Sequence, residues 1–173
     1  MNEAKWRPEV SDSPGSAKDD LEFAIGGKNR LTIWRFHEDI GRCTIKAERS
    51  FSVGGKGRDV TALEYVRSLM RGWVILVGLD SGAICYVDAD TGHIISEYSL
   101  SLKEISVIKF NNVNDKIVVA SLAGEIFHWR ASVAEAENLE LEVDVRKMKV
   151  ESGIVNLDLD PDYNEGVVST IDA

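Results

Sequence analysis

Residues 76–98 read L-V-G-L-D-S-G-A-I-C-Y-V-D-A-D-T-G-H-I-I-S-E-Y. The stretch threads three glycines, three aspartates and a histidine through an apolar run. Such a mixture is typical of a phosphate-binding loop, of a metal-binding loop or of the turns of a β-sheet. These interpretations imply different functions, and the rest of the chain distinguishes between them.

The composition predicts a folded chain that does not bind nucleic acid. Its 173 residues are 44% hydrophobic, which suits one ordinary domain with a sizeable core. The 29 acidic and 20 basic residues give a net charge of −9, which repels nucleic-acid backbones and anionic membrane surfaces. No apolar run approaches the roughly 18 residues of a membrane span. We therefore expect no nucleic acid and no membrane among the partners.

The two cysteines, Cys43 and Cys85, lie in apolar runs without a second Cys or a His at ligand spacing. This pattern predicts neither a disulfide framework nor a zinc site. It favours a reducing, intracellular compartment. Since the sequence also shows no signal-peptide pattern and no N-x-[ST] sequon, a cytoplasmic location is the expectation.

The N-terminal segment, residues 1–20, is polar and contains Pro8 and Pro14. We expect it to be a disordered leader. It holds one tryptophan, Trp6, between Lys5 and Arg7. Because Trp and Arg are favoured at binding hot spots, an alternative is that Trp6 is a short linear anchor for a partner.

From Leu21 onward, short apolar segments alternate with turns rich in Gly, Asn, Asp and Ser. This alternation predicts many short β-strands. The one helical candidate, residues 132–139, is too short to stand as an independent helix, and we expect a loop with at most one helical turn there.

One family of repeated segments covers residues 60–65, 105–110 and 154–159, at spacings of 45 and 49 residues. Each copy has apolar residues at its first, fourth and sixth positions. The repeat positions are Val60, Leu63 and Tyr65 in the first copy, Ile105, Ile108 and Phe110 in the second, and Ile154 and Leu157 in the third.

A second family covers residues 29–35, 82–88 and 124–130, at spacings of 53 and 42 residues. In each copy a turn residue, such as Gly82 or Gly124, opens a strand. The fifth residue after it is Trp34, Val87 or Trp129. Strands are also expected at 73–78, 116–121 and 166–171, and looser outer strands at 43–51, 94–100 and 139–145. The two families of repeated segments alternate along the chain at a common period, which indicates a four-stranded unit that recurs.

This unit resembles the WD40 repeat, whose last strand typically reads D-G-x-I-x-L-W-D. The closest copy here is D80-S-G-A-I-C-Y-V-D88, with Val87 in place of the family's Trp. Arg35 and Arg130 stand where the family usually has Asp, and the Gly-His pair that often opens a repeat is absent. The resemblance covers residues 21–173 and implies a β-propeller, with one four-stranded sheet in each blade.

The resemblance implies an all-β, WD40-like propeller segment. Its blades are expected to start at the outer strands, with complete blades from about residue 43 to 88 and from 94 to 130. We thus expect about two complete four-stranded blades plus two partial blades. Since propellers have about 4–8 blades, the segment is not a closed ring by itself. Two alternatives stay open: the remainder of its own propeller lies in a longer protein, or a second copy completes the ring.

Motifs for chemistry are incomplete. The loop at 52–59 lacks the G-K-[ST] of a phosphate loop, since Gly57 follows Lys56. The acidic run at 158–165 lacks the glycine and the final glutamate of a calcium loop, and a sheet turn beside a solvent-facing Asp158 is expected. The three histidines lack partners at ligand spacing. We expect no catalytic residue, no cofactor and no metal.

WD40 propellers are mostly rigid platforms for other proteins, so the resemblance implies a non-catalytic scaffold with protein partners. One alternative is a substrate-receptor subunit of a ubiquitin ligase, although the W-D-x-R sequence typical of that class is missing after Trp34, Val87 and Trp129. An enzyme is the distant alternative. In its degenerate repeats and long loops the chain is similar to large cilium- and centriole-associated WD-repeat proteins, which favours association with the cytoskeleton or a cilium.

Overall fold

The computed structural model describes residues 3–8, 21–68, 72–130, 146–161 and 165–171. Every helix or strand element within these ranges is a β-strand, as the alternating apolar segments predict. None of the described residues belongs to a helix that could cross a membrane. The helical turn expected at 132–139 and the strand expected at 139–145 lie outside the described residues.

The strands form a series of antiparallel sheets. The first sheet contains β1 (Glu3–Trp6), β2 (Leu21–Gly27), β3 (Arg30–His37) and β4 (Arg42–Ser50). The second contains β7 (Val60–Ser68), β8 (Gly72–Leu79), β9 (Ala83–Asp88) and β10 (Ile94–Ser99). The third contains β11 (Ile105–Asn111), β12 (Lys116–Ser121), β13 (Glu125–Arg130) and β14 (Arg146–Lys149). A two-stranded sheet of β15 (Gly153–Leu159) and β16 (Gly166–Ile171) follows, and β5 (Ser52–Val53) and β6 (Lys56–Gly57) form a small separate hairpin.

The outer strands belong to different sheets from those that the repeat spacing predicts. The spacing assigns the segments at 43–51 and 94–100 to the sheets that follow them, but β4 pairs with β3 and β10 pairs with β9. The turn before β10 is short and is held by the Asp88 carboxylate, which accepts hydrogen bonds from the backbone N–H groups of Asp90 and Thr91. Short connections of this kind favour antiparallel pairing. The described residues therefore form three four-stranded sheets and a two-stranded one, and the sheets begin and end at other residues than the blades expected at 43–88 and 94–130.

The prediction of a disordered leader does not hold for residues 3–6. These residues form β1, which pairs in register with β2. Lys5 donates to the buried Glu64 of the second sheet at 2.7 Å, and the Trp6 ring lies 4.7 Å from that of Phe23. Such tertiary contacts can order a strand that is too short and too polar to form alone. Residues 9–20 lie outside the described part of the chain.

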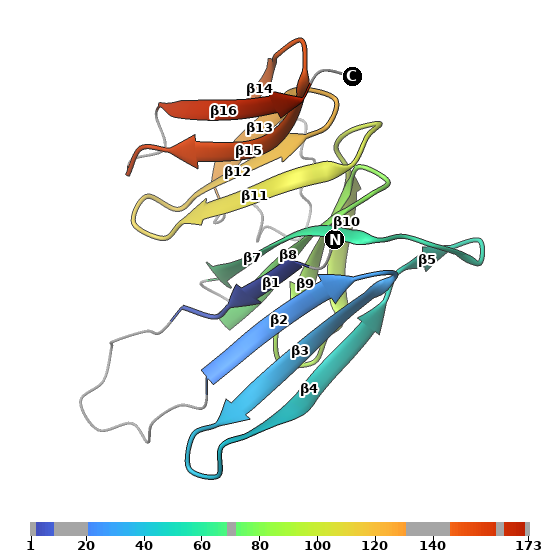
Figure 1. The fold of residues 1–173 in the computed structure, drawn as a ribbon, viewed down its shortest axis with the longest axis vertical. Helices are drawn as coiled ribbons and strands as arrows, with labels where there is room; N and C mark the ends of the chain where they lie inside the picture. The colour runs from blue at the N-terminus through green and yellow to red at the C-terminus, as the bar shows by residue number, and fades with distance from the viewer. Residues whose placement is uncertain (1–2, 9–20, 69–71, 131–145, 162–164, 172–173) are drawn as a thin grey trace.

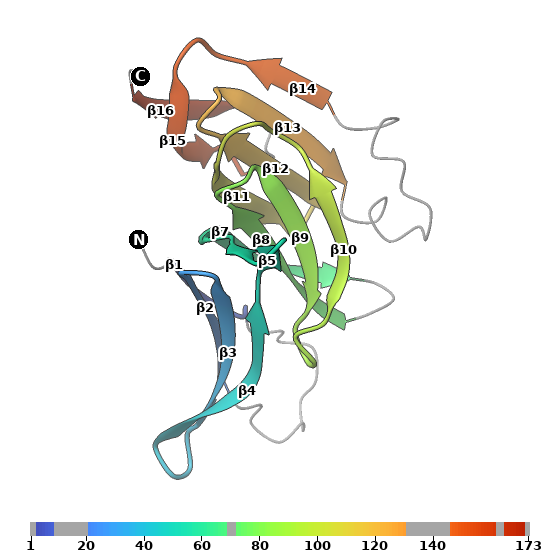
Figure 2. The same ribbon diagram turned by 90° about the vertical axis from the view of Figure 1, so that its right-hand side faces the viewer.

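The sheets follow one another from the N-terminal end of the molecule to the C-terminal end (Figures 1 and 2). Their first strands, β1, β7, β11 and β15, lie side by side. We call these the inner strands. The last strands, β4, β10 and β14, form the opposite edge of the stack (Figure 2).

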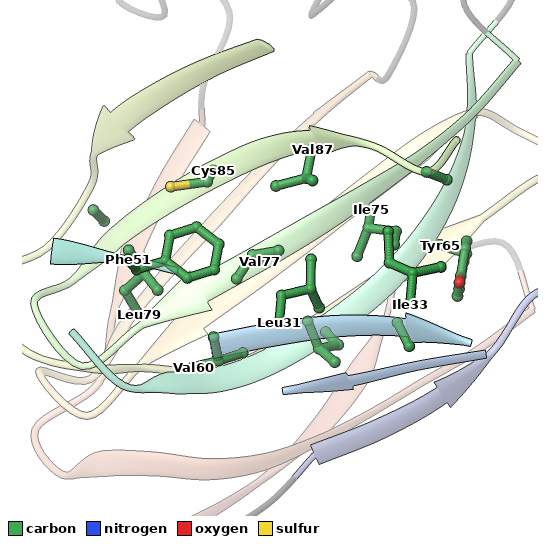
Figure 3. Packing of buried hydrophobic residues seen from close by; sticks show 14 residues of the cluster. Leu31, Ile33, Phe51, Val60, Tyr65, Ile75, Val77, Leu79, Cys85 and Val87 are labelled. Atoms are coloured by element: carbon green, nitrogen blue, oxygen red, sulfur yellow. The ribbon is translucent and has the colours of Figure 1, made fainter. Parts of the chain in front are cut away.

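The apolar core lies between successive sheets. One buried cluster fills the space between the first and second sheets, another that between the second and third, and a third that between the third sheet and β15–β16. Figure 3 shows the first cluster, in which Leu31 and Ile33 of the first sheet meet Ile75 and Val77 of the second. Burial of these side chains is the main force that holds the sheets together.

In the first and second sheets, a glycine leaves space for a branched residue of the next sheet. A Cβ atom added to Gly26 would lie 2.2 Å from Cγ1 of Val60, and one added to Gly78 would lie 2.6 Å from Cγ2 of Ile105. Gly26 and Gly78 stand opposite equivalent residues of the strands that follow them. Glycine therefore allows the two sheet backbones to approach closely at these positions.

Candidate functional site

The turns between the second and third strands of the sheets repeat one geometry. Asn29, Gly82 and Gly124 all have a positive φ, of 57°, 80° and 77°. The carbonyl of Gly82 accepts a hydrogen bond from the backbone N–H of Leu100, and that of Gly124 accepts one from Val150. A Cβ atom at Gly82 would lie 2.2 Å from a carbonyl oxygen, so the position requires glycine.

The repeat positions of the inner strands lie in the core. Those of β7 and β11 face the neighbouring sheets, as do those of β15. Phe110 is partly buried and packs against the cluster between the second and third sheets. The fully or nearly fully buried ones are Val60, Leu63, Tyr65, Ile105, Ile108, Ile154 and Leu157.

The repeat positions of the third strands differ among the sheets. Val87 and Trp129 are buried between sheets. The indole Nε1 of Trp129 also donates to the hydroxyl of Tyr86 in the preceding sheet at 2.9 Å. Trp34 is only partly buried, because it lies on the side of the first sheet that no described residue of another sheet covers.

The inner strands border a hollow of about 840 Å³. Its wall includes residues of β1, β7, β11 and β15, and thus of all the stacked sheets. Cations and carboxylates both line it, together with apolar side chains. The charged residues in the wall are Glu3, Lys5, Lys28, Asp59, Asp80, Glu104 and Lys109.

Burial raises the pKa of two carboxyl groups near the hollow. Desolvation raises the pKa of Glu64, although the Lys5 ammonium donates to its carboxylate. Desolvation also raises the pKa of Glu104, with a further contribution from the nearby charge of Asp80. Desolvation and like charge both disfavour ionisation, so positive charge near Glu104 would be stabilising.

Hydroxyl groups connect neighbouring inner strands along the same wall. Thr61 Oγ1 of β7 donates to the carbonyl oxygen of Ile105 in β11 at 2.6 Å. Ser106 of β11, at the equivalent repeat position, donates to the carbonyl oxygen of Ile154 in β15. These bonds fix the spacing of the strands around the hollow, and the wall is therefore a preformed surface.

A buried carboxylate holds the first sheet together. Glu22 of β2 accepts hydrogen bonds from Arg7 at 2.7 Å, Arg35 at 2.9 Å and Lys46 at 2.7 Å. A β-bulge in β4 aims Lys46 at the second sheet, where its ammonium also contacts Asp90 at 2.6 Å. Three cations compensate for the burial of one carboxylate, and Lys46 couples the first sheet to the second.

Two segments that resemble chemical motifs lie, in their described parts, in strands and turns. The glycine-rich loop at 52–59 contains the exposed β5–β6 hairpin, with positive φ at Gly54 and Gly55. Asp158 is exposed, as expected, and it belongs to β15 itself. Among the described residues, no group of three or more His, Cys, Asp or Glu could hold a metal ion.

The histidines and cysteines belong to no cluster of three or more potential metal ligands among the described residues. His37 forms a hydrogen bond with Thr44 at 2.9 Å, while His93 is exposed in the turn before β10. Burial raises the pKa of the Cys85 thiol to about 12, so this thiol is unreactive at neutral pH. Cys43 is a free thiol at the surface.

Comparisons with known proteins identify the fold. No protein-family model matches the chain, and no curated protein matches it in sequence. The chain is similar to one in the crystal structure of the Chaetomium thermophilum polycomb repressive complex 2, with a TM-score of 0.72 and 14% identity, over 96% of this chain and 34% of that chain. It is also similar to one in a mitotic checkpoint complex, with a TM-score of 0.62 and 14% identity, over 86% and 40%. The computationally designed Ika8 protein gives a TM-score of 0.60 and 18% identity, over 90% and 41%.

The chain spans about a third of the length of the polycomb chains that it matches. At these identities the likeness is one of fold. Together with the strand pairing, it confirms the predicted fold class. The described residues form an all-β, WD40-like propeller segment of four-stranded antiparallel sheets that do not close into a ring.

Proposed function

We propose that the chain is a non-catalytic scaffold in a multiprotein assembly, and that the hollow along the inner strands contacts a partner protein. The observation that supports this most is the wall of the hollow, to which every stacked sheet contributes. The similar folds include chains of two complexes, the polycomb repressive complex 2 and a mitotic checkpoint complex. The rest of a propeller ring, whether it belongs to a longer protein or to a second copy of this chain, is a further protein partner in this proposal.

The chemistry of the wall suits a protein segment better than a polyanion. Lys5 and Lys109 lie in the same hollow as Asp80 and Glu104, with apolar atoms between them. Such a surface can pair with charges of both signs on a peptide and bury apolar side chains between them. The Thr61 hydroxyl bond to the next inner strand keeps the surface in place before binding, which lowers the entropic cost of association.

Charge reversal in the wall tests the proposal. The tagged chain is expressed in cells as the wild type, as Glu104→Lys, and as the control Asp39→Lys, which makes the same charge change in an exposed turn outside the hollow. The proteins that co-purify are quantified by mass spectrometry. We expect a defined set to be retained by the wild type and the control and to be lost from Glu104→Lys. An identical set for all three variants would contradict the proposed surface.

Location in the cell is a separate part of the proposal. The sequence favours the cytoplasm, with association to the cytoskeleton or a cilium. Imaging of the tagged chain beside markers of the basal body and of the nucleus tests this. We expect the signal in the cytoplasm and at the basal body, and an exclusively nuclear signal would contradict the expected location.

A further inference from the structure

The first sheet has an apolar side that faces away from the second sheet. A row of residues in direct cross-strand register runs over all four of its strands, and we call it the open face. It consists of Trp6, Phe23, Trp34 and Ile45. The ring centroids of Trp6 and Phe23 are 4.7 Å apart, and the nearly parallel rings of Phe23 and Trp34 are 6.3 Å apart. Trp6 remains 57% exposed.

The open face occupies positions that other sheets bury. Glu3 pairs with Gly26 as Ala62 pairs with Gly78, so Trp6, three residues after Glu3, is the equivalent of Tyr65. Tyr65 is fully buried under the preceding sheet. Trp34 in turn corresponds to Val87 and Trp129, which are buried in the same way. We call the side of a sheet that packs on the following sheet its trailing side. The open face is therefore shaped to receive the trailing side of another sheet.

A trailing side of this type is uncovered at the other end of the stack. The β15–β16 sheet packs on the third sheet through Ile154 and Leu157, and its other side exposes Val155, Val167 and Ile171. We call these three residues the hairpin face. Val155 stands at the position of Thr61 and Ser106, whose hydroxyls reach the following sheet. The hairpin face therefore offers an apolar contact where the internal interfaces have a hydrogen bond.

We propose that the open face binds the hairpin face of a second copy of this chain, head to tail. Each contact repeats the packing of successive sheets within the chain, in which the trailing side of one sheet contacts the side of the next sheet that corresponds to the open face. Apart from the small β5–β6 hairpin, each copy supplies three four-stranded sheets and the two-stranded β15–β16 sheet, so two copies supply eight sheets, and propellers have about 4–8 blades. Two equivalent head-to-tail contacts then close a ring, which no single copy forms from its described sheets.

The test measures the molar mass of the purified full chain by sedimentation over a range of concentrations. The wild type is expected to have twice the 19.1 kDa mass of one chain. Ile45→Glu on the open face and Val167→Glu on the hairpin face are each expected to give monomers. Matched controls make the same changes elsewhere: Ile45 is 50% exposed and the control Ile40 is 60%, while Val167 is 73% exposed and the control Val113 is 88%. Ile40→Glu and Val113→Glu are expected to leave the dimer intact.

Several results would overturn this proposal. A wild-type chain that stays monomeric at every concentration would show that no second copy binds. A dimer broken by Ile45→Glu but kept by Val167→Glu would mean that two open faces meet each other. Dissociation by the control variants would locate the contact elsewhere. Circular dichroism accompanies every variant, and since all four substituted side chains are exposed, their folded spectra should match that of the wild type.

Discussion

Gly78→Ala tests the close approach of the second and third sheets. The added Cβ atom would lie 2.6 Å from Cγ2 and 2.9 Å from Cβ of Ile105, and 3.2 Å from Cβ of Ala62. Ile105 is fully buried, so it cannot turn away into solvent. The side chain can be accommodated only if the sheets separate or Ile105 leaves its preferred conformation.

Two effects set the size of the change. Overpacking of a core costs about 1–3 kcal/mol. Replacing glycine also restricts the unfolded chain, which returns about 0.4–1 kcal/mol. Because the added atom would meet the fully buried Ile105 at 2.6 Å, the overpacking cost falls in the upper part of its range, about 2–3 kcal/mol. We therefore expect Gly78→Ala to lower the free energy of unfolding by about 1–2.5 kcal/mol, equivalent to a fall in Tm of about 2–10 °C for a chain of this size.

Urea unfolding followed by tryptophan fluorescence measures the loss. A double-mutant cycle with Ile105→Ala identifies its source, because that change removes the Cγ2 atom with which the new methyl collides. The double variant should be more stable than the sum of the two single losses predicts, by about 1 kcal/mol. A Gly78→Ala chain as stable as the wild type, or additive losses in the cycle, would refute the packing described.

Three further predictions concern polar groups, each measured by urea unfolding. Glu22→Gln leaves three cations without their buried carboxylate and should cost about 3 kcal/mol. Glu48→Gln, which breaks a surface pair, should cost less than about 1 kcal/mol, and equal losses would contradict the role of burial. Trp129→Phe removes an indole donor from a buried tyrosine hydroxyl and should cost about 1 kcal/mol or more, so an unchanged midpoint would count against that bond. The hydrogen bond from Arg58 holds the pKa of Glu97 below its ordinary 4.5, so this pair stabilises the fold above that pH and the effect is lost as the pH falls through the lowered value. Glu97→Gln should remove this part of the acid dependence, and an identical pH profile would argue against it.

The sequence predicts the strand types well because they carry a repeated pattern. A positive-φ turn residue followed five positions later by a large apolar residue marks the third strand of each sheet, from Gly82 to Val87 and from Gly124 to Trp129. Branched residues such as Val60 and Ile105 mark the inner strands, because they fit against the small residues of the preceding sheet. Both signals are local and recur at nearly the same spacing.

The grouping of the strands into sheets is less predictable. An outer strand such as β4 can in principle pair with the strand before it or with the strand after it, since apolar alternation is the same in both cases. What decides is the connection. The turn at 38–41 joins β3 to β4 directly, whereas the link from β4 to β7 contains the β5–β6 hairpin. For β4 the shorter connection is therefore a better guide than repeat spacing, whereas the links before and after β10, at 89–93 and 100–104, are equally long and do not distinguish its two possible partners.

The first sheet also shows why apolar alternation can mislead. In β2 the large apolar residues Leu21, Phe23 and Ile25 alternate with Glu22, Ala24 and Gly26. Glu22, Ala24 and Gly26 are the buried residues, and the three large apolar residues are only partly covered. Three cations brought from other segments make the burial of Glu22 possible. The three apolar residues are only partly covered because they lie on the side of the sheet that faces away from the second sheet. The hollow could not be predicted from the sequence either, because its wall combines segments that are distant along the chain.

Nuclear Overhauser contacts between β9 and β10 test the central claim, which is that each four-stranded sheet starts at an inner strand and ends at the outer strand that follows along the chain. The register of β9 and β10 places Glu97 opposite Cys85. The account predicts backbone contacts between these two residues in the isolated chain. Contacts of residues 94–99 with 105–111 instead would contradict it, because β10 would then belong to the sheet that follows.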